Sequence, residues 1–178
     1  MQDIIKGDAG VIEGLSALCN GDAAVRHTSD HYGNGYHWFR LDTPHQLTAA
    51  ANVLKKAQAR LTMISAYNPK GDGTQEQALC YHFEAAGVLY NLTVTLNGEW
   101  PIVPSITPVF ANADWHEREM MELYGIKVTD HPNPKRLFLD EKLDAGLLKT
   151  ALPLSVVMNG ASTKDLWEKI LNDKEQPA

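Results

Sequence analysis

The sequence contains few cysteines and no long apolar run. Its two cysteines, Cys19 and Cys80, are too few for a disulfide framework or for a zinc or iron–sulfur site, which typically needs about four protein ligands. No apolar stretch approaches the roughly 20 residues that span a bilayer, and residues 1–10 lack the basic start and apolar core of a signal peptide. We therefore expect a cytoplasmic protein with reduced thiols, no cofactor and no direct membrane span.

Positive charge is also scarce. The 16 Lys and Arg residues against 22 Asp and Glu residues give a net charge of −6, which argues against nucleic acid or an anionic membrane surface as the main partner. The phosphate-binding patterns GxGxxG and GxxxxGK and the hydrolase pattern GxSxG are absent. The composition, with 44% hydrophobic and 21% charged residues over 178 positions, is instead typical of one soluble globular domain.

The histidines show no metal-ligand spacing along the chain. His116 and Glu117 begin an HExxH-like pattern, but Met120 occupies the position of the second histidine. His27 and His31 are four residues apart, a spacing that converges only on a helix, and this region is expected to form strands. The sequence therefore indicates no structural or catalytic metal site.

Hydrophobic periodicity and turn residues predict an alternation of helices and strands. The clearest helix start is Thr43 as N-cap, with Pro44 at the first helical position and Gln46 at the capping-box position. Residues 88–96 alternate apolar and mostly polar side chains, which favours antiparallel pairing with one buried face. In chain order we expect a helix at 11–18, a hairpin at 25–41 with its turn at 33–35, a helix at 43–61, strands at 61–67, 77–84 and 88–96, an extended arm at 101–108, a short helix at 115–124, an extended stretch at 126–128 and a last helix starting at Ser162.

These elements indicate an α+β fold in a single compact domain. We expect a mainly antiparallel or mixed sheet, helices packed on one face, a proline-rich extended arm and a short helix. Residues 1–35 would form an N-terminal helix and strand region, residues 36–140 the central part, and residues 141–178 a C-terminal extension with a helix.

The short helix has predicted boundaries at both ends. Asp114 is expected to cap its N-terminus, with Glu117 at the capping-box position. Gly125 stands where a left-handed residue ends a helix, because glycine has no Cβ to oppose a positive φ.

The same helix carries the densest polar cluster of the chain. Arg118 lies one turn from Glu122, so we expect an exposed ion pair worth under about 0.5 kcal/mol. Trp115, Tyr124 and two methionines crowd this element. Residue chemistry alone leaves two interpretations open, a solvated helix face and a protein contact surface.

Two groups of residues could serve catalysis. Cys80 and His82 are two apart on one strand face and could present a thiolate beside an imidazole. A buried thiol beside a hydrogen-bonded histidine is the alternative at that position. The carboxylates of Glu117 and Glu119 form the second group.

The segment around the short helix carries a family pattern. Residues 103–107, Val-Pro-Ser-Ile-Thr, and residues 111–115, Ala-Asn-Ala-Asp-Trp, resemble the arm and the helix lead of that pattern. Its further matches are Glu117, Arg118, Glu119, Glu122, Leu123, Tyr124, Gly125, Ile126, His131, Pro132 and Arg136, while Asp130 stands where the pattern has glycine. On these residues the sequence resembles the 30 kDa subunit family, found in the peripheral arm of NADH:quinone oxidoreductase, respiratory complex I. The resemblance covers about residues 36–140.

The resemblance implies a cofactor-free, non-catalytic subunit of a membrane-associated electron-transfer complex. A similar subunit occurs in energy-converting membrane-bound hydrogenases and formate hydrogenlyases. The implied partners are a large subunit, of 49 kDa or hydrogenase type, that carries the quinone or nickel–iron site, and neighbouring iron–sulfur subunits. The implied location is the inner face of the cell membrane. The implied interface residues are Trp115, Glu117, Arg118, Glu119, Glu122, Tyr124, Gly125, His131, Pro132 and Arg136, with Pro104, Ser105 and Thr107 in the extended arm.

Two hypotheses of function therefore remain. The first is a non-catalytic subunit of a redox complex. The second is a small free-standing cytoplasmic enzyme that uses Cys80 and His82, or the carboxylates of Glu117 and Glu119.

Overall fold

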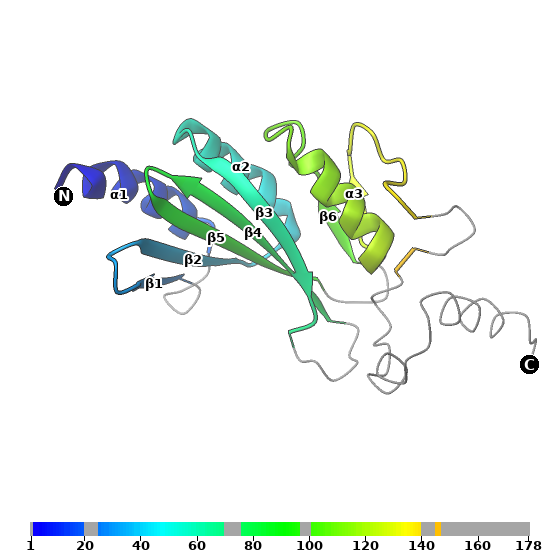
Figure 1. The fold of residues 1–178 in the computed structure, drawn as a ribbon, viewed down its shortest axis with the longest axis horizontal. Coiled ribbons are helices and arrows are strands. Elements are labelled where there is room, and N and C mark those ends of the chain that lie inside the picture. Colours follow the sequence, from blue (N-terminus) through cyan, green and yellow to red (C-terminus); the bar gives the residue numbers. More distant parts are fainter. Residues whose placement is uncertain (1, 20–24, 70–75, 97–100, 140–144, 147–178) are drawn as a thin grey trace, which may run out of the picture.

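Strands with alternating apolar residues form a sheet, and helices lie along one side of it (Figure 1). The computed structural model describes residues 2–19, 25–69, 76–96, 101–139 and 145–146. The predicted helix from Ser162 and residues 70–73 of the predicted loop lie outside these ranges. The described elements are α1 (Gln2–Ser16), β1 (Val25–Ser29), β2 (Gly35–Leu41), α2 (Leu47–Lys56), β3 (Arg60–Tyr67), β4 (Gln77–Ala85), β5 (Val88–Leu96), β6 (Ile102–Pro104), α3 (Ala113–Tyr124) and β7 (Lys127–Thr129).

Five strands form one mixed sheet in the order β1-β2-β5-β4-β3. β1 and β2 are the predicted antiparallel hairpin, and β4 pairs antiparallel with both β3 and β5. β2 and β5 run parallel, with Phe39 opposite Leu92. This pairing joins strands separated by α2, β3 and β4, so local sequence patterns do not indicate it. The expected α+β fold, with a mixed sheet and helices on one face, is confirmed.

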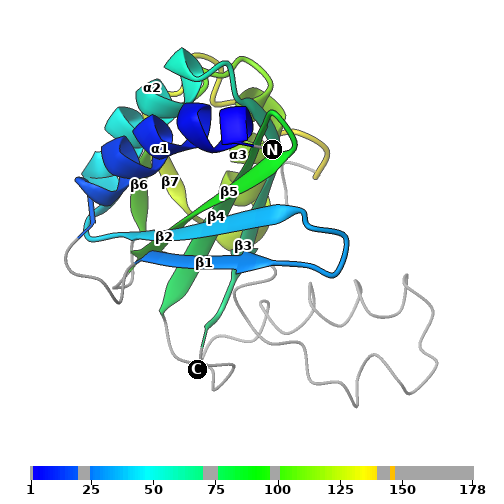
Figure 2. The ribbon, with the colours of Figure 1, turned by 90° about the vertical axis from the view of Figure 1, so that its left-hand side faces the viewer.

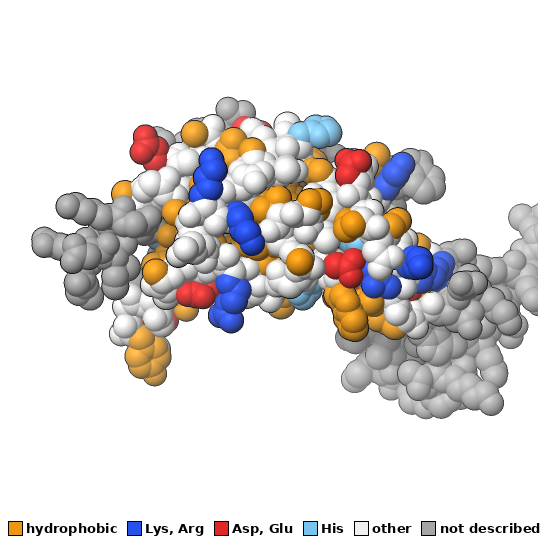
Figure 3. All heavy atoms as spheres, turned by 90° about the horizontal axis from the view of Figure 1, so that it is seen from above, with side chains coloured by type: hydrophobic (Ala, Val, Ile, Leu, Met, Phe, Trp, Pro, Cys, Tyr) orange, Lys and Arg blue, Asp and Glu red, His pale blue; other side chains and the backbone are white. Residues whose placement is uncertain are grey.

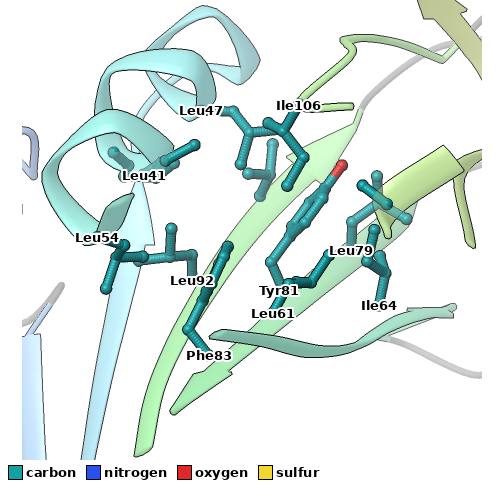
Figure 4. Close-up of a cluster of buried hydrophobic side chains, with 14 of the residues drawn as sticks. Leu41, Leu47, Leu54, Leu61, Ile64, Leu79, Tyr81, Phe83, Leu92 and Ile106 are labelled. Atoms are coloured by element: carbon teal, nitrogen blue, oxygen red, sulfur yellow. The ribbon is translucent and has the colours of Figure 1, made fainter. Parts of the chain in front are cut away.

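The hydrophobic core lies between this sheet and helices α1 and α2, which cover the same face (Figure 2). Leu47, Ala50, Ala51 and Leu54, which belong to the predicted apolar side of α2, are fully buried. Figure 4 shows Leu54 of α2 beside Leu92 of β5. Because burial of each such leucine contributes about 1.5–3 kcal/mol, these contacts hold α2 on the sheet.

Two predicted helix boundaries differ from the structure. The helix expected at 43–61 ends at Lys56, because Gln58 adopts a φ of 58° and stops the helical path. Leu61 therefore lies in β3 and points into the core from the sheet. The helix expected at 11–18 begins earlier, since α1 starts at Gln2. None of the helices in the described ranges is long and apolar enough to cross a bilayer.

The start of α2 follows the predicted capping signal. The side-chain Oε1 of Gln46 accepts hydrogen bonds from the backbone N–H groups of Asp42 and Thr43, at 2.9 and 3.0 Å. The first turn, Pro44–Gln46, is a 3-10 turn that leads directly into α2. A single oxygen of the glutamine side chain therefore accepts both backbone N–H groups that precede the turn, as in a capping box.

The proline-containing arm forms a second, smaller sheet. β6 pairs in parallel with β7, so that Val103 lies opposite Val128. The Ser105 N–H donates to the Thr129 carbonyl at 2.9 Å and extends this ladder. α3 connects the two strands in the chain, and their pairing places the arm and the residues after α3 side by side (Figure 2).

Candidate functional site

The polar residues of the family pattern gather where the arm meets α3. Most of them turn inward and bond one another or nearby backbone groups. We call this cluster the α3 junction, and its members are Ser105, Thr107, Asp114, Glu117, Arg118, Glu122 and His131.

Glu117 is the centre of the α3 junction and is fully buried. Its Oε2 accepts hydrogen bonds from the hydroxyls of Ser105 and Thr107, at 2.6 and 2.8 Å. Its Oε1 accepts the backbone N–H of Ile106 at 2.7 Å. A buried carboxylate needs such donors to replace water, and charge-assisted bonds of this kind are short and strong. Glu117 therefore fixes the arm to α3.

The predicted cap of α3 is wrong. The helix begins at Ala113, and Asn112 before it makes no side-chain capping bond. Asp114 lies inside the first turn, where its carboxylate is 3.6 Å from Nη1 of Arg118 and 3.4 Å from Nε2 of His131. A carboxylate in the first turn still favours the helix through the dipole of the peptide groups. Glu117 cannot complete a capping box because its side chain reaches the arm.

His131, in the segment after β7, contacts Asp114 and Glu117 of the α3 junction. Its Nδ1 accepts the backbone N–H of Asn133 at 3.0 Å, so in the neutral ring the proton sits on Nε2. Nε2 faces the backbone carbonyl of Asp114 at 3.3 Å and Oε2 of Glu117 at 3.5 Å. The side chain is completely buried. The imidazole therefore connects the segment after β7 to Asp114 and Glu117 of α3.

Arg118 is bonded within the chain, and the expectation of an exposed Arg118–Glu122 pair is wrong. Nε of Arg118 donates to the carbonyl of Lys135 at 2.7 Å, and Nη2 donates to the carbonyl of Arg136 at 2.6 Å. Only 12% of its side chain is exposed, and its carboxylate partner is Asp114, one turn towards the helix start. The planar guanidinium thus holds the segment after β7 against α3.

Glu122 holds the next part of the same segment. Its two carboxylate oxygens accept the backbone N–H groups of Phe138 and Leu139, at 3.2 and 2.9 Å. The residue is buried, and its own carbonyl accepts the N–H of Gly146 at 2.9 Å. A single residue of α3, Glu122, therefore positions the backbone of Phe138, Leu139 and Gly146.

Backbone conformation at two positions bears on the family pattern. Gly125 has a φ of 64° and ends α3, which confirms the predicted left-handed residue. Asp130 also has a positive φ, 58°, at the position where the pattern has glycine. Aspartate tolerates this conformation better than most residues, because its short polar side chain can bond locally.

The charge of Glu117 also affects Tyr81, a residue in the core of the larger sheet. Tyr81 of β4 is completely buried, and its hydroxyl has no hydrogen-bond partner in the described part of the chain. Figure 4 shows this hydroxyl beside Ile106, the residue whose N–H Glu117 accepts. Burial, and secondly the charge of Glu117, raise the pKa of Tyr81 well above its ordinary value. The phenol therefore stays neutral in the folded protein.

Two large apolar side chains point outward beside the junction. Trp115 is 68% exposed and Phe138 is 61% exposed. Between α3 and the segment after β7 lies a small pocket of about 120 Å³, lined by Arg118, Met121, Glu122, Pro134, Lys135, Arg136 and Ala145. Seen from the helix side, apolar, acidic and basic side chains lie next to one another at the α3 end of the molecule (Figure 3).

The residues predicted to form an interface therefore divide into two groups. The inward group, the α3 junction, builds the local structure. Trp115, Pro132 and Arg136 are exposed, whereas Pro104, Glu119, Tyr124 and Gly125 are partly buried. The outward residues form the candidate docking surface, which consists of Trp115, Pro132, Arg136, Phe138 and the rim of the pocket.

The second predicted constellation, Cys80 with His82, lies on the sheet face opposite α1 and α2. Cys80 Sγ is 3.9 Å from Nδ1 of His82, but that nitrogen also bonds Oδ1 of Asn91 at 2.7 Å. Nε2 of His82 faces the hydroxyl of Ser65 at 3.2 Å. Burial raises the pKa of the Cys80 thiol, which opposes formation of a thiolate. The geometry is that of a satisfied polar network across three strands.

Sequence reasoning missed two polar contacts that join α3 to the larger sheet. Nδ2 of Asn112 donates to the carbonyl of Leu61 at 2.9 Å, and Nε2 of Gln77 donates to the carbonyl of Tyr124 at 3.2 Å. Asn112 lies in the helix lead of the family pattern, but the pattern does not indicate this contact. No motif marks Gln77, and its one sequence signal is a polar amide at the start of an apolar strand.

Comparison with known sequences agrees with the family pattern. Residues 42–160 match the model of the family described as respiratory-chain NADH dehydrogenase, 30 Kd subunit. The chain is 48% identical over 58 residues to an NADH-quinone oxidoreductase subunit of Rhodopseudomonas palustris strain TIE-1, a match that covers 33% of this chain and 28% of the relative. It is 30% identical over 100 residues to the mitochondrial NADH-ubiquinone oxidoreductase 30.4 kDa subunit of Neurospora crassa, a match that covers 54% of this chain and 35% of the relative. These matches thus span about a third of each relative's length.

Two solved structures share the fold. The trypsin-resistant fragment of Nqo5, residues 1–134, superposes with a TM-score of 0.53 at 19% identity, over 71% of this chain and 98% of the fragment. A protein in the structure of the membrane-bound sulfane sulfur reductase, an archaeal respiratory membrane complex, superposes with a TM-score of 0.56 at 16% identity, over 77% of this chain and 79% of that protein. The family model covers most of the chain, including the whole α3 junction. The chain belongs to the family of the 30 kDa subunit of the respiratory-chain NADH dehydrogenase.

Proposed function

We propose that the chain is a non-catalytic subunit, without a redox cofactor of its own, in a membrane-associated electron-transfer complex of NADH:quinone oxidoreductase or membrane-bound nickel–iron hydrogenase type. It docks on the large subunit that carries the quinone or nickel–iron site, and it contacts neighbouring iron–sulfur subunits. Its place is the cytoplasmic side of the membrane. Family membership supports this proposal, as do the names of its relatives, which are subunits of quinone oxidoreductases.

One structural observation carries the docking role. Asp114, Arg118 and Glu122 of α3 are bonded within the chain, and yet Trp115 on the same helix is 68% exposed. An exposed tryptophan on a rigidly held helix is typical of the side chains that dominate protein interfaces. Internal bonding of the charges means that little ordering is needed when a partner covers this surface.

A free-standing enzyme is less well supported by the geometry. The Cys80 thiol is buried with a raised pKa, and His82 is bonded by Asn91 and Ser65. Glu117 is wholly buried and accepts hydrogen bonds from Ser105, Ile106 and Thr107. Each of these groups is therefore committed to a structural contact.

Identification of the bound partners tests the proposal. The protein is tagged in its source cells, detergent-solubilised membranes are passed over the affinity resin, and the eluted proteins are identified by mass spectrometry. We expect stoichiometric recovery of a large subunit of quinone-site or nickel–iron type, with iron–sulfur subunits. Recovery of the tagged protein alone from the soluble fraction would contradict the proposal and favour the enzyme.

A further inference from the structure

Two histidines far from the α3 junction face each other across the edge hairpin. His27 of β1 lies directly opposite His37 of β2, and their Nδ1 atoms are in contact. The two histidines are ten positions apart in the chain, a separation that no metal-ligand spacing rule covers, and only the strand register brings the two imidazoles together. β1 is the edge strand of the described sheet and pairs there with β2 alone.

The two rings differ in their surroundings. The His37 ring stands beside Tyr90 of β5, with ring centroids 5.4 Å apart, and is half-buried. The His27 ring meets the Phe39 ring edge-on at 6.3 Å and remains exposed to solvent. One ligand is thus fixed by the sheet, and the other is accessible and can adjust.

The turn of the hairpin is fixed as well. The carboxylate of Asp30 accepts the backbone N–H groups of Tyr32 and Asn34, each at 2.9 Å, and the side-chain amide of Asn34 at 2.7 Å. These bonds hold the pKa of Asp30 below its ordinary value. The strands that carry the histidines therefore keep their register, so binding requires a side-chain rotation and no backbone rearrangement.

We propose that His27 and His37 form a binding site for a divalent transition metal ion of the kind that prefers imidazole, with zinc as the probe. Neutral imidazole is a good ligand for zinc, copper and nickel, and each ring can offer the Nδ1 lone pair while its proton sits on Nε2. Zinc–nitrogen bonds are about 2.0–2.1 Å long, so the two Nδ1 atoms separate by a small rotation of the exposed His27 ring to admit the ion.

The site has two protein ligands. The described residues contain no group of three or more His, Cys, Asp or Glu side chains placed to hold a metal ion. Water or a partner's side chain completes the coordination. The bound ion links the edge strand β1 to β2 and so stabilises the hairpin. This stabilisation does not depend on docking at α3 or on redox chemistry.

Calorimetry on the full-length protein tests this site. The metal-free protein is titrated with zinc chloride, and its melting temperature is measured with and without zinc. We expect wild type to bind a single zinc ion per molecule and to melt at a higher temperature when zinc is present. His27→Ala and His37→Ala should each weaken binding by about tenfold or more. His31→Ala, in the turn of the same hairpin, and His45→Ala, before α2, alter exposed histidines outside the pair and should leave the affinity unchanged.

His27→Ala decides the result even if loss of His37 loosens the packing on Tyr90, because His27 is exposed and its removal leaves the core intact. Imidazole nitrogen NMR adds an independent readout, since zinc should shift the Nδ1 resonances of both rings. Absence of zinc binding, or equal affinity in wild type and His27→Ala, would overturn the proposal. Loss of binding in His31→Ala or His45→Ala alone would also overturn it, by locating the ion at another histidine.

Discussion

The five-stranded sheet and the α3 junction are held together by different physical means. Beneath α1 and α2, contacts are apolar, as between the fully buried Leu54 and Leu92. At the junction the central side chain is a buried carboxylate, Glu117, with three donors and an imidazole around it. Apolar packing is non-directional and tolerates changes of shape, whereas a buried charge requires each of its partners. The comparison indicates that the sheet provides general stability and the junction fixes one local geometry.

Glu117→Ala should produce the largest loss of stability. Removal of the carboxylate leaves the donors of Ser105, Ile106 and Thr107 buried without an acceptor, and we expect a loss of about 3–5 kcal/mol. Chemical denaturation monitored by circular dichroism measures it. In the sheet, Leu79→Ala should cost about 2–5 kcal/mol through its cavity.

Conservative substitutions should show a larger difference in stability loss between the sheet and the α3 junction than alanine substitutions do. Leu79→Met keeps volume and should cost less than about 1.5 kcal/mol. Glu117→Gln keeps shape but places a donor against other donors, and should cost about 2–3 kcal/mol. An equal, small cost for both variants would show that the junction is held by packing.

Arg118→Ala should be the next largest effect. The guanidinium donates to two carbonyls and is largely covered, so we expect a loss of about 1.5–3 kcal/mol in the isolated protein. Arg60→Ala is the matched control, because Arg60 is 72% exposed and pairs with Glu84 at 3.5 Å on the sheet surface. That pair should contribute less than about 1 kcal/mol. Similar melting temperatures for the two variants would contradict a stabilising role for Arg118 and would indicate that it behaves like an exposed surface arginine.

Gly125→Ala should cost about 1–2 kcal/mol. The residue has a φ of 64°, and an added Cβ would lie 3.4 Å from the Cα of Gly146. Gly10→Ala is the opposite case: it lies in α1, nothing lies within 4 Å of its Cβ position, and alanine there should stabilise by about 0.5–1 kcal/mol. Shifts of the melting temperature in the same direction for both would contradict the assignment of Gly125 as the helix end.

The smallest expected effects come from replacing a residue by glycine at one position in the five-stranded sheet and at one position beside the α3 junction. Ala86 in the β4–β5 turn and Asp130 after β7 have positive φ values of 50° and 58°. Replacement by glycine relieves this conformation, so Ala86→Gly should stabilise by up to about 1 kcal/mol, and Asp130→Gly by less, since aspartate tolerates it better. Differential scanning calorimetry can resolve the order. Destabilisation by Asp130→Gly would mean that its side chain makes a needed contact.

The sequence predicted those parts of the fold that depend on local patterns. The β1–β2 hairpin, the capping signal at Thr43 that precedes α2, the β4–β5 alternation and the left-handed Gly125 follow from periodicity and turn chemistry, which act over a few residues. The parallel pairing of β2 with β5 was not predictable in this way, because it depends on strands distant in the chain.

The sequence singled out the residues of the α3 junction but not the orientation of their side chains. A helix model places Arg118 near both Asp114 and Glu122, and only the position of residues 135–136 decides which contact forms. Glu117 matches a capping box by spacing, yet the arm supplies three donors to it and outcompetes one N–H group. Phe138 carries no local signal, and only the structure shows that its backbone is bonded to Glu122 while its side chain is exposed.

The most direct test of the docking surface is partner recovery with surface variants. Trp115→Ala combined with Phe138→Ala removes the two exposed apolar side chains beside the junction, and Tyr32→Ala, 81% exposed on the distant hairpin, is the control. We predict that the double variant keeps the wild-type melting temperature within about 2–4 °C, because both side chains are exposed. It should recover about tenfold less large subunit in co-purification, whereas Tyr32→Ala recovers the wild-type amount. Equal recovery by the double variant and wild type would contradict docking through this surface.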